Sequence, residues 1–335
     1  MEAMQYLRLH VITLTITMVK VDRRGSELKH INIAFRFVNG VTINDMKYLC
    51  IRLSNKQHIY GIGFLAVTAL LWSLGGVFIK NISLHGMAIA GWHSLLALPV
   101  LLLVLRRRHL TFSGPQIAGA VCYATCLICF VCANKMTTAA NAILLQYTAP
   151  IFVALLGLFY LKEKVTGFDW LTIAIALAGI ALFFLDELTL QNKKGNWIGI
   201  ASGLAFAGMF IFLRKQKDDF PLGSVFIGNI FVGVVCLPFM IQSLPDPRSG
   251  CFLLLLGFVQ VGLAYIFYAE AISRVDALES IMITTIEPIL NPVWVLIFIG
   301  EKPGPWALAG GFIVIATILM RAVYKLKLVR PESNP

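Results

Sequence analysis

The chain has 335 residues, 58% of them hydrophobic and 13% charged, and its mean hydropathy is +0.80. A soluble globular chain is typically about 45–50% apolar and about a quarter charged, so this composition excludes an ordinary soluble domain and indicates a polytopic α-helical membrane protein. The net charge of +11 does not indicate a nucleic-acid partner, because the basic residues form short clusters between apolar runs and no long basic face.

The first 57 residues differ from the rest of the chain. Their apolar stretch Val11–Val19 is shorter than the about 20 residues that span a bilayer. A charged segment follows it without the small-residue cleavage site of a signal peptide. We expect residues 1–57 to lie outside the membrane domain, with Met46 as an alternative start of the chain.

From residue 58 onward, ten apolar segments alternate with short loops. Each segment is close to the length that crosses the hydrocarbon core as a helix, which predicts an all-α fold of ten transmembrane helices. The segments cover residues 59–79, 86–105, 115–134, 139–161, 168–185, 195–213, 222–241, 250–271, 277–299 and 304–324.

The distribution of Lys and Arg predicts the orientation of these helices, because cytoplasmic loops are enriched in both. With the N-terminus inside, thirteen basic residues fall on the cytoplasmic side: Arg106, Arg107, Arg108, Lys162, Lys164, Arg214, Lys215, Lys217, Arg274, Arg321, Lys325, Lys327 and Arg330. Six fall on the opposite side: Lys80, Lys135, Lys193, Lys194, Arg248 and Lys302. The count predicts that both termini are cytoplasmic, with residues 326–335 as a cytoplasmic tail.

Two similar segments indicate an internal repeat. Pro150 precedes Glu163 by thirteen residues, and Pro288 precedes Glu301 by the same spacing, at an offset of 138 residues. Repeats over residues 58–188 and 189–325 would each hold five spans, an odd number, so the two would insert with opposite topology. Inverted repeats of this kind are typical of carriers with a site near the midplane. The alternative is a chance likeness between two leucine-rich helices.

At this point the sequence resembles a pair of EamA domains of the drug/metabolite transporter superfamily. The resemblance rests on Trp72-Ser73, on the segments PIFVALLGLFYLKEK and EPILNPVWVLIFIGEK, and on Gly310-Gly311, and it covers about residues 60–324. It implies a ten-helix basket whose central cavity opens to each side in turn, and transport of small polar metabolites, amino acids prominent among them. Such proteins often carry an Arg before Leu95-Leu96-Ala97, where this chain has Trp92-His93.

Glu287 is the sharpest candidate for the substrate path. It lies near the middle of the ninth segment, where an ionised carboxylate is costly unless it is paired or hydrated. Pro288 removes a backbone hydrogen bond and predicts a kink that exposes polar backbone to a cavity. Asn291 follows one turn later on the same face. Glu287 would bind a substrate amine or carry a proton; a structural hydrogen bond between helices is the alternative.

In the first half Pro150 predicts a corresponding kink. Gln146 and Tyr147 just before it could hydrogen-bond a zwitterion, and ordinary interhelical hydrogen bonding is the alternative. Asn141 and Asn229 are weaker candidates.

Further candidates are a histidine and two aromatic residues. His93, inside the second segment, would titrate during transport or form an interhelical hydrogen bond. Trp72 and Tyr265 lie well inside their spans and are expected to line the cavity.

Other motifs favour structural interpretations. Glu163 and Glu301 are expected to support the starts of the helices that follow them. Cys122, Cys126 and Cys129 have the CxxxCxxC spacing of an iron–sulfur motif, but they lie within an apolar span, which favours packing. We expect no metal, no cofactor and no catalytic residue.

The function predicted from these features is secondary transport of small polar metabolites by alternating access, with export favoured. A membrane-embedded enzyme acting on a lipid-linked substrate is the alternative. The expected partners are a small-molecule substrate and the lipid bilayer, with proton coupling and a homo-oligomer left open. The expected location is the bacterial cytoplasmic membrane.

Overall fold

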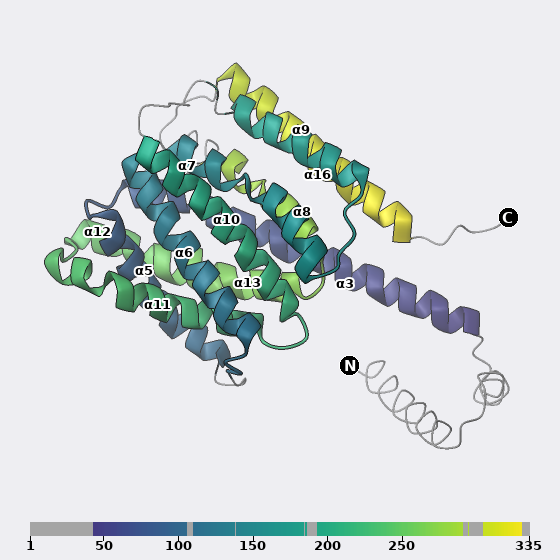
Figure 1. The fold of residues 1–335 in the computed structure, drawn as a ribbon, viewed down its shortest axis with the longest axis horizontal. Coiled ribbons are helices and arrows are strands. Elements are labelled where there is room, and N and C mark those ends of the chain that lie inside the picture. The colour runs from purple at the N-terminus through teal and green to yellow at the C-terminus, as the bar shows by residue number, and fades with distance from the viewer. Residues whose placement is uncertain are drawn as a thin grey trace. The chain divides into compact units, whose positions relative to one another are not determined.

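The computed structural model describes residues 43–105, 110–137, 139–183, 185, 193–290, 294 and 304–329, with side chains from residue 57 onward except at 139–141, 307, 322 and 325–329. Every regular element in these ranges is helical (Figure 1). The chain divides into a unit of residues 1–54 and a unit of residues 55–335. The rest of this description concerns the second unit.

The helices of the first half follow the expected apolar segments closely. They are α3 (Ile43–Trp72), α4 (Gly75–Lys80), α5 (Gly86–Leu105), α6 (Gly114–Met136), α7 (Ala139–Gln146), α8 (Ala149–Tyr160) and α9 (Gly167–Phe183). Helix α3 begins before residue 57, within the segment expected to lie outside the membrane domain.

The second half contains a π-helical stretch, η3, between two α-helices. Its elements are α10 (Lys193–Lys215), α11 (Pro221–Gln242), α12 (Pro247–Leu255), η3 (Leu256–Leu263), α13 (Ala264–Ile272), α14 (Ala277–Thr284) and α16 (Pro305–Val329). Residues 287–290 are also helical. The expected span 277–299 is described only in part.

Seven helices, some of them interrupted, are long and apolar enough to cross a bilayer, and residues 167–183 and 308–321 form shorter apolar helices. Large apolar side chains are exposed on the outside of the bundle, among them Phe159, Val234 and Phe312, which are 78%, 67% and 74% exposed. A soluble protein rarely exposes so many large apolar side chains, whereas lipid can cover them.

Close contacts at glycines define how the helices pack. A Cβ on Gly257 of η3 would lie 2.8 Å from the carbonyl oxygen of His93, so α5 approaches the π-helical backbone directly. Helix α9 lies alongside α16 (Figure 1), and a Cβ on Gly310 would overlap the carbonyl oxygen of Gly179. Small residues of this kind let membrane helices pack backbone to backbone.

A buried ion pair joins α9 to α16. Arg321 Nη2 and Nε donate to Asp169 Oδ1 at 2.9 and 3.1 Å. The other carboxylate oxygen accepts from Thr166 N at 2.8 Å, and Asp169 N donates to Thr166 Oγ1, which is a capping box at the start of α9. Arg321 was counted with the cytoplasmic basic residues in the sequence, but it is buried in this pair.

Candidate functional site

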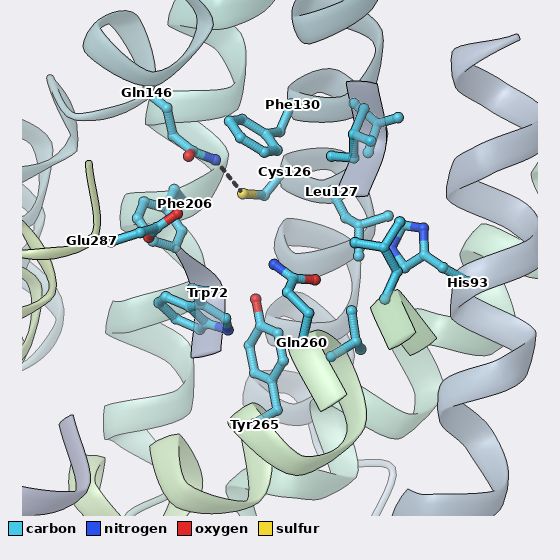
Figure 2. A pocket seen from close by; sticks show the side chains of 14 residues that line it. Trp72, His93, Cys126, Leu127, Phe130, Gln146, Phe206, Gln260, Tyr265 and Glu287 are labelled. Atoms are coloured by element: carbon cyan, nitrogen blue, oxygen red, sulfur yellow. Dashed lines mark hydrogen bonds between the residues drawn. The ribbon is translucent and has the colours of Figure 1, made fainter. Parts of the chain in front are cut away.

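A cavity lies between the two halves of the chain (Figure 2). The space in it that is open to water-sized molecules is about 60 Å³, and a water needs roughly 10–15 Å³ on this measure, so the cavity has room for several water-sized groups. Its lining comes from α3–α7, α10, η3, α13 and the helical residues 287–290: Trp72, Ile79, His93, Cys126, Leu127, Phe130, Val131, Gln146, Phe206, Leu256, Gln260, Val261, Tyr265 and Glu287.

Two helix breaks lie beside this cavity, at corresponding positions of the two halves. Helix α7 ends at Gln146, and after a turn at residues 147–148 α8 starts at Ala149, next to Pro150. Helix α14 ends at Thr284, and after a turn at residues 285–286 the chain is helical again from Glu287, next to Pro288. Both turns lie just before the prolines at which kinks were expected. Each position in the first break lies 138 residues before its counterpart in the second break.

The carbonyl groups next to these breaks lack their usual donors, because a proline has no N–H to offer four residues later. Pro288 leaves the carbonyl of Thr284 without its helical partner. That carbonyl lies 2.7 Å from Tyr147 Oη of the other half. The hydroxyl of Tyr147, in the first break, therefore supplies the hydrogen bond that the carbonyl of Thr284 lacks within its own helix.

Glu287 contacts the same tyrosine. Its Oε2 lies 2.7 Å from Tyr147 Oη. Tyr147 is fully buried and is not among the residues that line the cavity, whereas Glu287 is one of them. Among the described residues that line the cavity, Glu287 is the one carboxylate, and Lys and Arg do not occur.

Aromatic side chains form one wall of the cavity. Trp72 packs against Tyr265 and Phe206 with ring centroids 5.1 and 5.8 Å apart. Trp72 Nε1 is buried and has no hydrogen-bond partner in the part of the chain that the structure describes. Tyr265 Oη contacts only a weak acceptor among these residues, Met209 Sδ at 3.6 Å. Among the described residues, this wall therefore has one donor without a partner and one with only a weak partner.

A polar cluster lies on another side of the cavity. Gln146 Nε2 donates to Ser202 Oγ at 3.0 Å and lies 3.4 Å from Cys126 Sγ. Ser202 Oγ in turn donates to the carbonyl of Cys126 at 3.1 Å. These bonds join α6, α7 and α10 and hold the Gln146 amide at the cavity.

Sequence reasoning missed Gln260 as a cavity residue. Its amide projects into the space between Trp72, Cys126 and Tyr265 (Figure 2). A glutamine in the middle of an apolar span was the available signal. Sequence reasoning also gave Cys126 no role beyond packing, although this cysteine lines the cavity.

The remaining candidates take different positions. His93 lines the cavity, and its Nδ1 lies 2.7 Å from the carbonyl of Ile89 in its own helix, not in a neighbouring one. Asn229 Oδ1 accepts from Tyr123 Oη at 3.2 Å, which joins α11 to α6 outside the cavity lining. Asn291, Glu301 and the side chain of Asn141 lie outside the described residues.

The expectation for Glu163 was wrong in one respect. Its carboxylate supports the start of α14, through the N–H of Ala277 at 3.2 Å, and not the start of the helix that follows it. Arg214 Nε also donates to it, at 3.3 Å. Burial raises the pKa of the Glu163 carboxyl above its usual range; nearby Asp276 adds to the rise and Arg214 opposes it.

The described part of the chain holds no group of three His, Cys, Asp or Glu side chains that could bind a metal ion. Cys122, Cys126, Cys129 and Cys132 are free thiols along α6.

Several known transporters are similar in sequence to this chain over more than half of its length. Solute carrier family 35 member G1 of Homo sapiens is 22% identical over 290 residues, 79% of each chain. An uncharacterized transporter of Archaeoglobus fulgidus is 26% identical over 292 residues, 80% of this chain and 98% of the other. A probable terminal-alkyne amino-acid exporter of Streptantibioticus cattleyicolor is 23% identical over 204 residues, 59% of this chain and 68% of the exporter.

A crystal structure of another protein has the same fold, with a TM-score of 0.69 at 14% identity over 82% of this chain and 99% of the other. The sequence profile of the EamA-like transporter family matches residues 59–185 and again residues 193–322. Together these two matches cover most of the chain, and both ranges contribute residues to the cavity lining. The chain is therefore a multi-pass membrane protein of the EamA-like transporter family, within the drug/metabolite transporter superfamily.

Proposed function

We propose that this transporter is a secondary carrier that exports amino acids or related small polar metabolites by alternating access. Its ten helices form two inverted five-helix repeats, residues 58–188 and 189–325. Residues 1–57 lie outside this membrane domain, and residues 326–335 form a cytoplasmic tail. Both termini are cytoplasmic, and the membrane is the bacterial cytoplasmic membrane.

The matching breaks support the repeat arrangement. Thr148 N bonds to the carbonyl of Leu145 at 3.3 Å, and Ile286 N bonds to the carbonyl of Ile283 at 3.2 Å. Donor and acceptor are each displaced by 138 residues between the halves. Discontinuous helices at corresponding positions are typical of carriers built from repeats, with the substrate site at the repeat interface.

The groups that line the cavity favour a zwitterionic substrate, and this is the observation that carries the proposal. Glu287 offers a carboxylate to an amine, a charge-assisted hydrogen bond that is stronger than a neutral one. Trp72, Tyr265 and Gln260 line the same cavity and carry N–H and O–H groups that suit a carboxylate. A relative named as an amino-acid exporter agrees with this class of substrate.

The main alternative is a membrane-embedded enzyme acting on a lipid-linked substrate. Such an enzyme needs several titratable side chains together at one membrane face. The described cavity lining offers one carboxylate and one histidine, Glu287 and His93, and its other titratable side chains are the weak acids Cys126 and Tyr265. This arrangement suits binding better than acid–base catalysis.

A counterflow experiment with two glycine variants tests the proposal. A Cβ on Gly75 would lie 2.9 Å from Nε2 of Gln260 and displace that flexible amide, whereas a Cβ on Gly63 would meet nothing within 4 Å. Vesicles containing the purified protein are loaded with a pool of the twenty amino acids, and the uptake of each labelled amino acid is followed.

We expect saturable exchange of one group of amino acids. Gly75→Ala should raise the half-saturating concentration about fivefold, because one net hydrogen bond is worth about 1 kcal/mol. Gly63→Ala should exchange like the wild type. Uptake that does not saturate, or equal behaviour of the two variants, would contradict a carrier whose substrate binds in this cavity.

A further inference from the structure

The face of α6 that lines the cavity continues one turn beyond it. Leu127, Phe130 (both in Figure 2) and Val131 line the cavity, and Asn134 follows them at the spacing that keeps side chains on one face of a helix. Asn134 is fully buried, and neither its Nδ2 nor its Oδ1 has a hydrogen-bond partner in the part of the chain that the structure describes. A buried amide without partners destabilises the fold, so folding alone does not account for this residue.

Two lysines lie at the same end of the cavity. Lys80 Nζ, at the end of α4, donates to the carbonyl oxygen of Asn134 at 3.1 Å, and Lys135 Nζ donates to the carbonyl oxygen of Ile82 at 2.8 Å. Each of these contacts uses one of the three hydrogens of an ammonium group. No Asp or Glu among the described residues forms an ion pair with either lysine. The buried amide therefore lies beside positive charge that no described carboxylate neutralises.

The loop between α4 and α5, residues 81–85, joins the two halves of the chain at this end. Its contact with α6 is the hydrogen bond from Lys135. Its contacts with the start of α12 come from Ser83, whose Oγ donates to Asp246 Oδ1 at 3.2 Å and whose N–H donates to Ser249 Oγ at 3.3 Å. The carboxylate of Asp246 is thus engaged by the loop and by the N–H of Ser249. These bonds must break before a solute can pass between the cavity and the solvent beneath this loop.

We propose that Asn134 and Lys80 bind the carboxylate of the substrate at this end of the cavity, as the substrate passes beneath the loop 81–85. This inference rests on the proposed carrier function. The amide and the ammonium offer one neutral and one charged donor, and a charged donor forms the stronger bond with a carboxylate. The described cavity lining itself contains no Lys or Arg, so the positive charge distinguishes this second site. In the proposed orientation this is the outer end, where an exported substrate is released.

Stability separates this role from a structural one. Asn134→Leu removes the two unpartnered polar atoms and keeps a side chain of similar size, so the midpoint of thermal unfolding should rise by about 2 °C or more. Asn229→Leu is the matched control. The Asn229 amide is equally buried, but it accepts from Tyr123 Oη at 3.2 Å and donates to the carbonyl of Val225 at 2.8 Å. The midpoint of this control should fall.

Exchange is then measured with the full chain reconstituted in one orientation, using the amino acid that counterflow identifies and the carboxamide of that amino acid. On the side of the loop 81–85, Asn134→Leu and Lys80→Gln should each raise the half-saturating concentration of the amino acid about tenfold or more, because each removes a donor to a charged group. The value on the opposite side should change less. The uncharged carboxamide should lose less affinity than the amino acid does in Lys80→Gln. Lys194→Gln, at an exposed lysine of α10, should behave like the wild type.

An Asn134→Leu protein that is less stable than the wild type, or that does not fold, would mean that the amide has a structural partner and would overturn this inference. Wild-type exchange in Asn134→Leu and Lys80→Gln would also overturn it and leave the carrier in place. So would a Lys80→Gln effect that appears only in vesicles containing phosphatidylglycerol, because the lysine would then bind lipid headgroups. The absence of exchange for all twenty amino acids would overturn the carrier and the inference together.

Discussion

Loss of the buried charge on Asp169 should destabilise the protein more than loss of an exposed charge. Asp169 and Arg321 are only 4% and 3% exposed, and they are joined by two hydrogen bonds. Asp169→Asn leaves the guanidinium buried without its counter-charge. Breaking such a pair from one side typically costs about 3–5 kcal/mol.

The double variant Asp169→Asn/Arg321→Met removes both charges, so most of that cost should disappear. We expect a loss of about 1–2 kcal/mol, which is the cost of weakened capping and packing. The assay is reversible unfolding in mixed detergent micelles, followed by helical circular dichroism. Glu270→Gln, which breaks an ion pair whose glutamate is 57% exposed, serves as the matched control and should cost at most about 1 kcal/mol.

An Asp169→Asn protein as stable as the Glu270→Gln control would refute this reasoning, because it would mean that the pair is solvated. Additive effects of the two substitutions would refute it as well, since additivity means that the two charges do not interact.

Three further predictions concern other parts of the molecule. Gly310→Ala should cost about 3 kcal/mol or more in the same unfolding assay, because its Cβ would meet the backbone of α9; Gly311→Ala, whose Cβ would come no closer than 3.2 Å to a side chain, should cost less. Glu163→Gln should flatten the pH dependence of stability just above the ordinary carboxyl pKa. The pKa of Glu163 is raised in the folded protein, so at these pH values the folded protein binds more protons than the unfolded protein does. The stability of the wild type therefore falls as pH rises through this range. Gln260→Leu should weaken substrate exchange several-fold in counterflow while leaving the unfolding midpoint near that of the wild type.

Much of the fold could be predicted from the sequence, because bilayer thickness fixes the length of an apolar helix. The expected spans agree with the seven long apolar helices to within a few residues at each end. The two prolines also marked where helices break, since proline removes a hydrogen bond wherever it occurs.

The contacts between distant segments could not be predicted in this way. The partners of Tyr147 lie 137 and 140 residues away, and hydropathy carries no information on such pairs. Arg321 looked like a cytoplasmic basic residue, because nothing local indicated Asp169, 152 residues earlier. The π-helical stretch at 256–263 has no proline or charge to mark it, so the projection of Gln260 into the cavity was not expected.

The most direct test of alternating access is the accessibility of Cys126 from the two sides of the membrane. A protein that keeps this thiol alone, with the other cysteines replaced by serine or alanine, is reconstituted in one orientation. It is then treated with a membrane-impermeant thiol reagent, from outside or from inside the vesicles. We predict that Cys126 reacts from both sides and that the transported amino acid slows both reactions. Reaction from one side only, at a rate that the amino acid does not change, would contradict a cavity that opens to each side in turn.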